Sequence, residues 1–267
     1  MSVDEIILQD STRGMDVLQK LYPKKHCKEA VEAFKKLEKG VVFLYTGFYV
    51  GGFAETDGPI GTYFLARALN SLGYKSVIIT DRFCKDYFKE IETLYIPLEG
   101  YSEEYYKTII DEYNPICHFS IERCGKNGDG EYANLRGVSV SKFTAPVDDL
   151  YVLGAKSRPT FAIGDGGNEL GMGNFAKSVI KYLSLNPCII SSDFPIIATV
   201  SNWGAYGFMA YLDETLVPSF DEVDEYLGYI VSLGSVDGVK VKNQKTVDGK
   251  DWSIEKKILE DLKKAVI

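Results

Sequence analysis

The stretch VVFLYTGFYVGGFAETDGPIGTYFLARALNSLG, residues 41–73, decides the fold class. Its first five residues, Val41–Tyr45, form a continuous apolar run, which is typical of a strand buried on both faces. A glycine-rich turn follows, and Pro59–Leu72 then carries apolar residues at helical spacing. Pro59 suits the first turn of a helix, and Gly73 suits the position just after its end. The stretch therefore predicts a strand, a loop and a helix, which is the repeating unit of α/β proteins.

The same unit recurs along the chain. We expect further strands at Ser76–Thr80, Thr93–Ile96, Ile116–Ile121, Thr160–Ile163 and Ile196–Val200. We expect helices at Lys25–Glu38, Ser102–Glu112, from Pro146, Asn168–Leu183, Trp203–Glu214 and Ile254–Val266. Strands that alternate with helices predict right-handed crossovers and a largely parallel sheet. We therefore expect an α/β protein with a three-layer Rossmann-like fold, in which residues 1–267 form a single domain.

Composition excludes several classes of function. Hydrophobic residues make up 45% and charged residues 25% of the 267 residues, which is typical of a globular protein. Since no apolar run approaches the length of a membrane span, we expect no membrane segment. The net charge of −8 argues against a nucleic-acid partner or an anionic membrane. The start, Met1–Glu5, lacks the basic and apolar regions of a secretion signal, so we expect a cytoplasmic protein.

The cysteine and histidine content argues against a structural metal site. The chain has five cysteines, no CxxC pair and two histidines, so we expect reduced thiols and no zinc centre. One histidine, His118, falls inside an apolar strand and is expected in the core. We expect no organic cofactor, and we leave open a divalent cation and a homo-oligomer.

Glycine-rich, charged loops follow four of the predicted strands. They are Gly51–Pro59, Glu122–Gly137, Gly164–Asn174 and Ser201–Gly204. In such folds ligands bind beyond the carboxyl ends of the strands. Glycine lets the backbone approach a ligand closely and point successive N–H groups at it. The loops therefore predict one small-molecule site at this edge of the sheet.

Common nucleotide signatures do not fit these loops. No GxxxxGK[ST] motif occurs, and the glycines from Gly47 to Gly61 do not give GxGxxG between strand and helix. Asp81 stands where a ribose-binding acid could stand, but we favour a helix cap for it. Gly164–Glu169 is similar to the GDGxND loop of haloacid-dehalogenase-type phosphatases. That class needs a nucleophilic aspartate at the strand end, where this chain would supply Glu55, well past it.

Three longer motifs resemble the D-glutamate cyclase C-terminal-type domain. They are GFAETDGPIG at Gly52–Gly61, IERCGKNGDGEYANLRG at Ile121–Gly137 and IGDGGNELGMG at Ile163–Gly173. Weaker matches lie at Val236–Gly238 and Thr246–Gly249, so the resemblance covers nearly the whole chain. It implies a hydro-lyase that converts D-glutamate, an acidic amino acid, to 5-oxo-D-proline and water.

This reaction needs a base and an acid. The amino group must lose a proton before it attacks, and the departing carboxylate oxygen must gain one. Glu122 and Asp165 each follow a strand directly, so we expect them to converge with Asn202 at one edge of the sheet. Because two close carboxylates split their pKa values, Glu122 and Asp165 are our preferred catalytic pair. Glu169, expected on the first turn of its helix, and Asp57 are in reserve.

Several other residues are expected to bind the substrate. Arg136 and Arg123 could hold carboxylates in bidentate fashion, although Arg123 could instead form a surface ion pair. The N–H groups of the loop before the predicted helix could bind an anion, and Asn134 and Asn202 could orient the amine. The predicted binding residues are Gly52, Thr56, Asp57, Gly58, Arg123, Asn134, Arg136, Gly166, Gly167, Asn168 and Asn202.

Two other classes of function stay open on the sequence alone. Asp165 and Asp57 could hold magnesium through oxygen ligands, so the loops could hydrolyse a phosphorylated metabolite. The protein could also bind a metabolite or nucleotide without turnover.

Overall fold

The computed structural model describes residues 1–265, which are built around one parallel sheet of six strands. The strands are β1 (Val41–Tyr45), β4 (Lys75–Thr80), β5 (Thr93–Tyr95), β6 (Cys117–Ile121), β7 (Thr160–Gly164) and β8 (Phe194–Ile197). Their order is β5-β4-β1-β6-β7-β8, and every neighbouring pair is parallel. The chain therefore winds outward from β1 in one direction and from β6 in the other. This confirms the predicted Rossmann-like arrangement.

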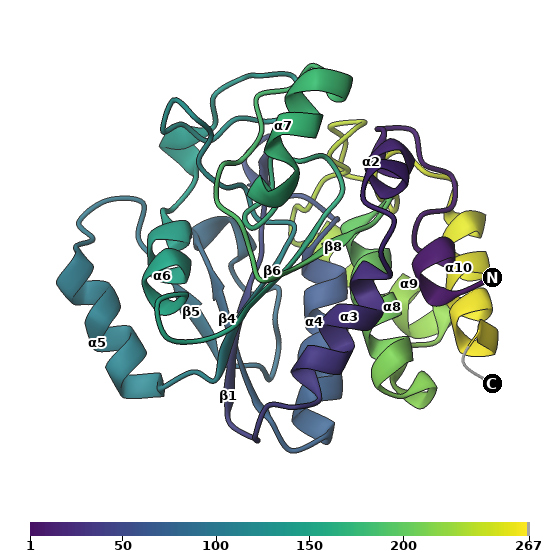
Figure 1. Ribbon diagram of the computed structural model, residues 1–267, viewed down its shortest axis with the longest axis horizontal. Helices are drawn as coiled ribbons and strands as arrows, with labels where there is room; N and C mark the ends of the chain where they lie inside the picture. The colour runs from purple at the N-terminus through teal and green to yellow at the C-terminus, as the bar shows by residue number, and fades with distance from the viewer. Residues whose placement is uncertain (266–267) are drawn as a thin grey trace.

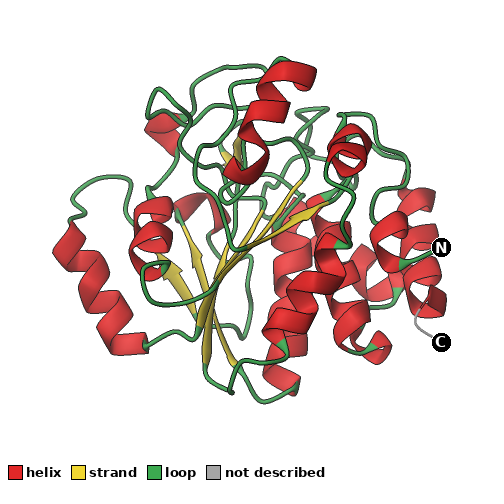
Figure 2. Ribbon diagram, in the orientation of Figure 1, coloured by secondary structure: helices red, strands yellow, loops and turns green. Residues whose placement is uncertain are grey.

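Helices cover both faces of the sheet (Figure 1). One face carries α3 (His26–Phe34), α4 (Pro59–Ser71) and α8 (Ser201–Leu212), with α1 (Val3–Ile6), α9 (Phe220–Ser232) and α10 (Trp252–Ala265) beyond α8. The other face carries α5 (Glu103–Tyr113) and α6 (Val147–Gly154). Figure 2 shows the resulting three layers, with most of the long loops gathered at the upper edge of the sheet.

Alternation along β1 explains why both faces need helices. Val42 and Leu44 pack in the core beneath α3, α4 and α8, whereas Phe43 and Tyr45 pack toward α5 and α6. His118 on β6 is fully buried, and its Nδ1 lies 2.6 Å from the Tyr45 hydroxyl. Burial lowers the pKa of His118 to about 3. The predicted core histidine is therefore confirmed.

The bounds of two predicted elements are wrong. No helix starts at Asn168: residues 165–172 form a loop, followed by short helical turns at Gly173–Phe175, Ala176–Ser178 and Val179–Leu183. The reason is that Gly167 and Gly171 adopt left-handed backbone angles, with φ of 95° and 94°. The sixth strand ends at Ile197 instead of Val200, because Val200 already precedes α8 as its N-cap residue.

Some elements were not expected. The glycine-rich loop after β1 contains a short hairpin, β2 (Tyr49–Val50) with β3 (Phe53–Ala54). The helix α9 starts with a capping box formed by Ser219 and Glu222.

The chain opens with α1, α2 (Met15–Leu21) and α3, and α10 confirms the predicted C-terminal helix. Val266, the last residue predicted for that helix, lies outside the described residues.

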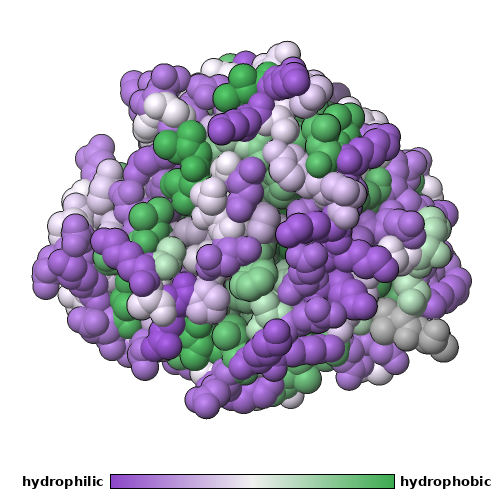
Figure 3. Space-filling view, in the orientation of Figure 1, coloured by the Kyte–Doolittle hydropathy of each residue, from purple (hydrophilic) through white to green (hydrophobic). Residues whose placement is uncertain are grey.

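The outer surface is mainly polar. Hydrophilic side chains cover most of the face seen in Figure 3, and apolar side chains are scattered over it. Among residues 1–265, no helix combines the length and the apolar character needed to cross a membrane.

The contact between α4 and α8 positions two of the loops and can be tested at Gly61. A Cβ at this position would lie 2.8 Å from the Cβ of Ala205 and 2.9 Å from the Cα of Asn202. We expect Gly61→Ala to lower the free energy of unfolding by about 1–3 kcal/mol, because overpacking outweighs the better helix propensity of alanine.

Gly128→Ala is the matched control, because its nearest neighbour would be 4.0 Å away. Urea unfolding of both variants makes the comparison. Equal stability of the two variants would show that the helices can separate freely at this point.

Candidate functional site

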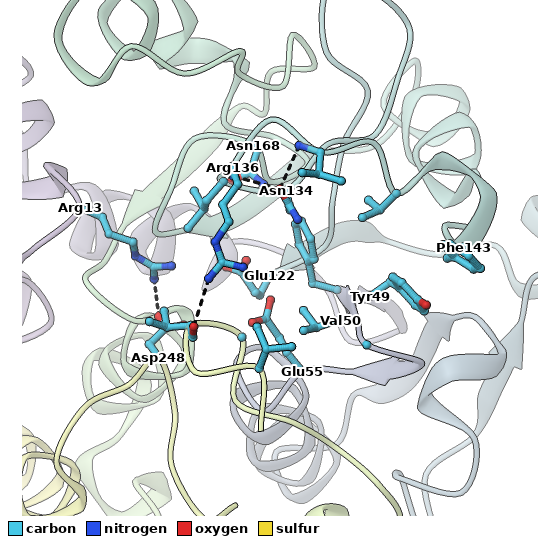
Figure 4. A pocket seen from close by; sticks show the side chains of 18 of the residues that line it. Arg13, Tyr49, Val50, Glu55, Glu122, Asn134, Arg136, Phe143, Asn168 and Asp248 are labelled. Carbon is cyan, nitrogen blue, oxygen red and sulfur yellow. Dashed lines mark hydrogen bonds and ion pairs between the residues drawn. The ribbon is translucent and has the colours of Figure 1, made fainter. Parts of the chain in front are cut away.

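A cavity of about 540 Å³ opens between the loops that follow β1 and β6. β1 and β6 are neighbours in the sheet, and the strand order runs in opposite directions on either side of this pair. Doubly wound folds bind ligands at such a switch point. Its walls come from the loops after β1, β6 and β7, from the segment before α2 and from the residues 238–250 before α10. Figure 4 shows side chains from these segments pointing toward one another.

Glu122 projects into this cavity from the end of β6. It adopts a left-handed backbone conformation, with φ of 47°, which is uncommon for a residue other than glycine. Gly58 makes room for it, since a Cβ there would lie 2.6 Å from the Cβ of Glu122. Val241 and Asp248 also line the cavity with φ of 52°. Backbone strain of this kind gathers at functional sites, so it supports a site here.

Three buried carboxylates meet beside the cavity. One oxygen from each of Asp57, Glu122 and Asp165 lies within 4.8 Å of the others. The convergence expected for Glu122 and Asp165 is therefore present. Three oxygen donors at this spacing could hold a hard divalent cation. The Glu122 carboxylate also accepts a hydrogen bond of 2.6 Å from the Ser201 hydroxyl.

Burial changes the acidity of this cluster. It raises the pKa of Glu122 well above the usual value, and the charge of Glu169 adds to the effect. Burial likewise raises the pKa of Asp165, partly opposed by the charge of Arg13. It raises the pKa of Asp57 to about 7, with a further contribution from the charge of Asp248. The carboxyl groups of this cluster therefore hold protons more tightly than carboxylic acids in water do.

Arg13 supplies positive charge at the wall of this cluster. Its guanidinium forms ion pairs with Asp165 and Asp248, and about a fifth of its side chain stays exposed. Arg13 is not predictable from the sequence, since nothing distinguishes it from other charged residues near the N-terminus. Glu55, a lining residue, was predicted only as a position compared with the phosphatase nucleophile. Asp248 could have been predicted from the sequence, because it lies in one of the weaker family motifs.

Asp57 and Asn202 fasten the loop after β1 to the start of α8. The Asp57 carboxylate accepts 2.8 Å hydrogen bonds from the backbone N–H groups of Ser201 and Asn202. The Asn202 side chain accepts from the N–H of Gly58 and donates to the carbonyl of Thr56. These hydrogen bonds occupy the Asn202 side chain in the structure, and its role in orienting the substrate amine stays a prediction. Asp57 likewise acts mainly by fixing this junction.

The loop after β7 binds one of its own carboxylates. The N–H of Gly167 donates a 2.6 Å hydrogen bond to Glu169, and the N–H of Gly166 also favours the charged form of that carboxylate. The Glu169 carboxylate therefore occupies the predicted anion site at these glycines in the structure. Glu169 is buried and shapes the loop, and its reserve catalytic role stays a prediction. Asn168 lines the cavity and donates to the carbonyl of Ala133.

The two predicted arginines have different roles. Arg123 is fully buried, pairs with Asp81 at 2.7 Å and donates to the carbonyl of Gly47, so it cannot bind substrate or form a surface ion pair. Asp81 also caps the short helical turn that follows it, as predicted. Arg136 does line the cavity, where it donates to the carbonyl of Val239.

Asn134 and Gly52 shape their own loops. The Asn134 side-chain oxygen accepts hydrogen bonds from the N–H groups of Arg136 and Val138, so this oxygen is not free for a substrate amine. Gly52 takes φ of 105° in the β2–β3 turn. The Thr56 hydroxyl donates to the carbonyl of Thr246. These residues support the cavity walls, and the predicted contacts with substrate are not available to the Asn134 oxygen or to the Thr56 hydroxyl.

A doubly wound parallel sheet with an acid-lined cavity at its switch point defines an α/β protein with a small-molecule site. Residues 3–263 match the family described as "D-glutamate cyclase-like, C-terminal", and the chain belongs to this family. Over 182 residues the chain is 34% identical to a Homo sapiens protein named "D-glutamate cyclase, mitochondrial". The match covers 59% of this chain and 29% of that relative, so the chain spans less than a third of the relative's length.

The acidity of Asp57 predicts a pH dependence of stability. Its pKa rises from 3.8 to about 7 on folding, so the folded state binds the proton more tightly. The resulting stabilisation is complete below about pH 4 and is lost as the pH rises through about 7. We expect it to contribute roughly 3 kcal/mol more to stability at pH 5 than at pH 8.

Urea unfolding of the protein and of Asp57→Asn at both pH values checks this. The variant should lack this part of the pH dependence, whereas Asp111→Asn, at an exposed position of α5, should retain it. An identical pH dependence in all three proteins would contradict the assignment.

Proposed function

We propose that the protein is a hydro-lyase that cyclises D-glutamate to 5-oxo-D-proline with release of water. The observation that carries the proposal is Glu122, a cavity-lining carboxyl group whose pKa is raised by burial among other carboxylates. Membership of the D-glutamate cyclase-like family supports the same reaction.

The reaction joins the amino nitrogen of glutamate to its own δ-carbon. The ammonium group must lose a proton first, and a carboxylate at the cavity wall can accept it. The cavity wall offers Glu55 and Glu122 for this step. Because these groups lie among several other acids, one can be ionised while another carries a proton. We assign the base to Glu55 and the acid to Glu122.

The departing carboxylate oxygen must gain two protons to leave as water, and the nitrogen loses two as the ammonium group becomes the lactam N–H. Glu55 can accept protons from the nitrogen and Glu122 can donate to the oxygen, since burial raises the pKa of Glu122, so the two acids relay both protons. The Ser201 hydroxyl holds the Glu122 carboxyl in one orientation. Folding the substrate so that nitrogen faces the δ-carbon supplies much of the remaining acceleration through proximity.

The substrate carboxylates need positive charge. Arg13, Arg136 and Lys250 all line the cavity. Arg13 stays fixed by Asp165, which we assign as a positioning residue because it is buried behind Arg13. This arrangement replaces the original catalytic pair of Glu122 and Asp165 with Glu122 and Glu55.

The reaction itself is the first test. Purified protein is incubated with D-glutamate and, separately, with L-glutamate, and 5-oxoproline is measured by chromatography. We expect the product from the D-isomer. Failure with both isomers would overturn the proposal, and equal rates would overturn the assigned chirality.

The assigned acid is tested by Glu122→Gln. We expect kcat/KM for D-glutamate to fall by at least about 10²-fold, because glutamine has the same size but cannot donate the proton. Glu99→Gln changes an exposed glutamate in the same way and should keep normal activity. Normal turnover by Glu122→Gln would remove this residue from the mechanism.

The base is assigned by comparing two further variants. Loss of activity in Glu55→Gln supports Glu55 as the base. If Glu55→Gln is active and Asp165→Asn has lost at least about 10²-fold, then Asp165 is the partner of Glu122 after all.

A magnesium-dependent phosphohydrolase is the second candidate function. It is favoured by the three carboxylate oxygens that lie within 4.8 Å of one another at Asp57, Glu122 and Asp165. EDTA treatment followed by added Mg²⁺ separates the two functions. Loss and recovery of phosphatase activity on phosphorylated metabolites would favour the second candidate, whereas cyclisation that survives EDTA favours the first.

A further inference from the structure

The cavity has two chemically different ends. Figure 4 shows the charged side chains of Arg13, Asp248, Glu122 and Glu55 on one side, and Tyr49, Val50 and Phe143 on the other. The reaction proposed above uses only the charged end. Tyr49, Val50 and Phe143 form the apolar end, and the valines Val138, Val239 and Val241 also line the cavity.

The aromatic side chains of the apolar end pack against one another and stay partly exposed in the free protein. Tyr49 stacks on Phe143 with ring centroids 4.4 Å apart and an interplanar angle of 12°, and Phe83 supports Tyr49 from its edge. Phe143 is 38% exposed, and Val138 is 57% exposed. Exposed apolar side chains that gather at one cavity mark a surface that gains free energy when a ligand covers it.

Free glutamate is too small to reach across this cavity. A volume of about 540 Å³ falls in the range of roughly 300–1,000 Å³ that holds drug-sized ligands. A bound glutamate that uses the charged end therefore leaves the apolar end empty. The cavity fits a glutamate that carries an apolar substituent.

Chemistry and charge decide where the substituent is attached. The amine must stay free to attack, which leaves the two carboxyl groups as the polar groups of glutamate that can carry the substituent. Free glutamate has a net negative charge and meets the buried acids Glu55 and Glu122 and the lining acid Asp248. Substitution of the γ-carboxylate removes one negative charge and also turns a poor electrophile into a better one. Substitution of the α-carboxylate would leave the poor electrophile in place.

We propose that the preferred substrate is a D-glutamate whose γ-carboxyl group is joined as an amide to an apolar amine. This inference rests on the proposed function, because it assigns a substrate class to the same site. The α-amine nitrogen bonds to the γ-carbonyl carbon, and the bond from that carbon to the leaving nitrogen breaks. The attacking nitrogen loses two protons as the ammonium group becomes the lactam N–H; one is donated to the departing nitrogen and the other is released to solvent. The products are 5-oxo-D-proline and the free amine.

The test compares D-γ-glutamyl anilide with D-glutamate on the purified protein, with 5-oxoproline and aniline measured in parallel. We expect kcat/KM for the anilide to exceed that for D-glutamate by at least about tenfold, since filling an apolar pocket is worth roughly 10–200-fold. Equal or lower values for the anilide would overturn this inference and leave the cyclase proposal standing. No 5-oxoproline from either compound would overturn the proposed function itself.

The apolar end is tested by Phe143→Ser, with Tyr105→Ser as the matched control. Both aromatic side chains are 38% exposed, and Tyr105 lies on α5 away from the cavity wall. We expect Phe143→Ser to lower the ratio of the two kcat/KM values, anilide over glutamate, by at least about fivefold. Tyr105→Ser should leave this ratio unchanged. A ratio that Phe143→Ser does not change would show that the substituent does not bind here.

Discussion

The rest of the structure depends on the cost of burying many carboxylates at one point of the fold. Glu55, Asp57, Glu122 and Asp165 are all less than a tenth exposed. Ion pairs from Arg13 offset part of this cost at Asp165 and Asp248. For the remaining acids, burial disfavours the charged form, and this raises the pKa of Glu122 and Asp57. A set of acids that holds protons near neutral pH can both donate and accept them, which is what the cyclisation of an amino acid requires.

The surrounding fold is arranged to keep these acids in place. Gly58 has no side chain at the point where the Glu122 side chain lies. The side-chain amide of Asn202 forms hydrogen bonds that fasten the neighbouring loop to α8. The N–H groups at the start of α8 hold Asp57 and oppose part of the rise in its pKa that burial causes. Glu122 and Asp248 keep left-handed backbone angles, which persist only where the surrounding structure enforces them. The site is therefore tied to the same contacts that stabilise the fold.

The sequence was sufficient to predict the parallel sheet but not to predict all residues of the site. Apolar runs such as Val41–Tyr45 predict buried strands because burial on both faces demands such runs, and the strand bounds are confirmed to within a few residues. Glu122 and Asp165 could be placed because each directly follows a strand. Arg13 could not be placed, because its partners Asp165 and Asp248 lie far away in sequence. Glu169 was misplaced because the left-handed angle of Gly167 stops a helix from forming there.

The central claim is that the carboxyl cluster holds protons near neutral pH, and the most direct measurement is the ¹³C NMR titration of glutamate and aspartate side-chain carboxyl groups in EDTA-treated protein. We predict at least one glutamate carboxyl signal that titrates well above the usual glutamate pKa of about 4.3 and that disappears in Glu122→Gln. If every glutamate and aspartate carboxyl group is already ionised at about pH 6, the cluster holds no proton for catalysis and the account is contradicted.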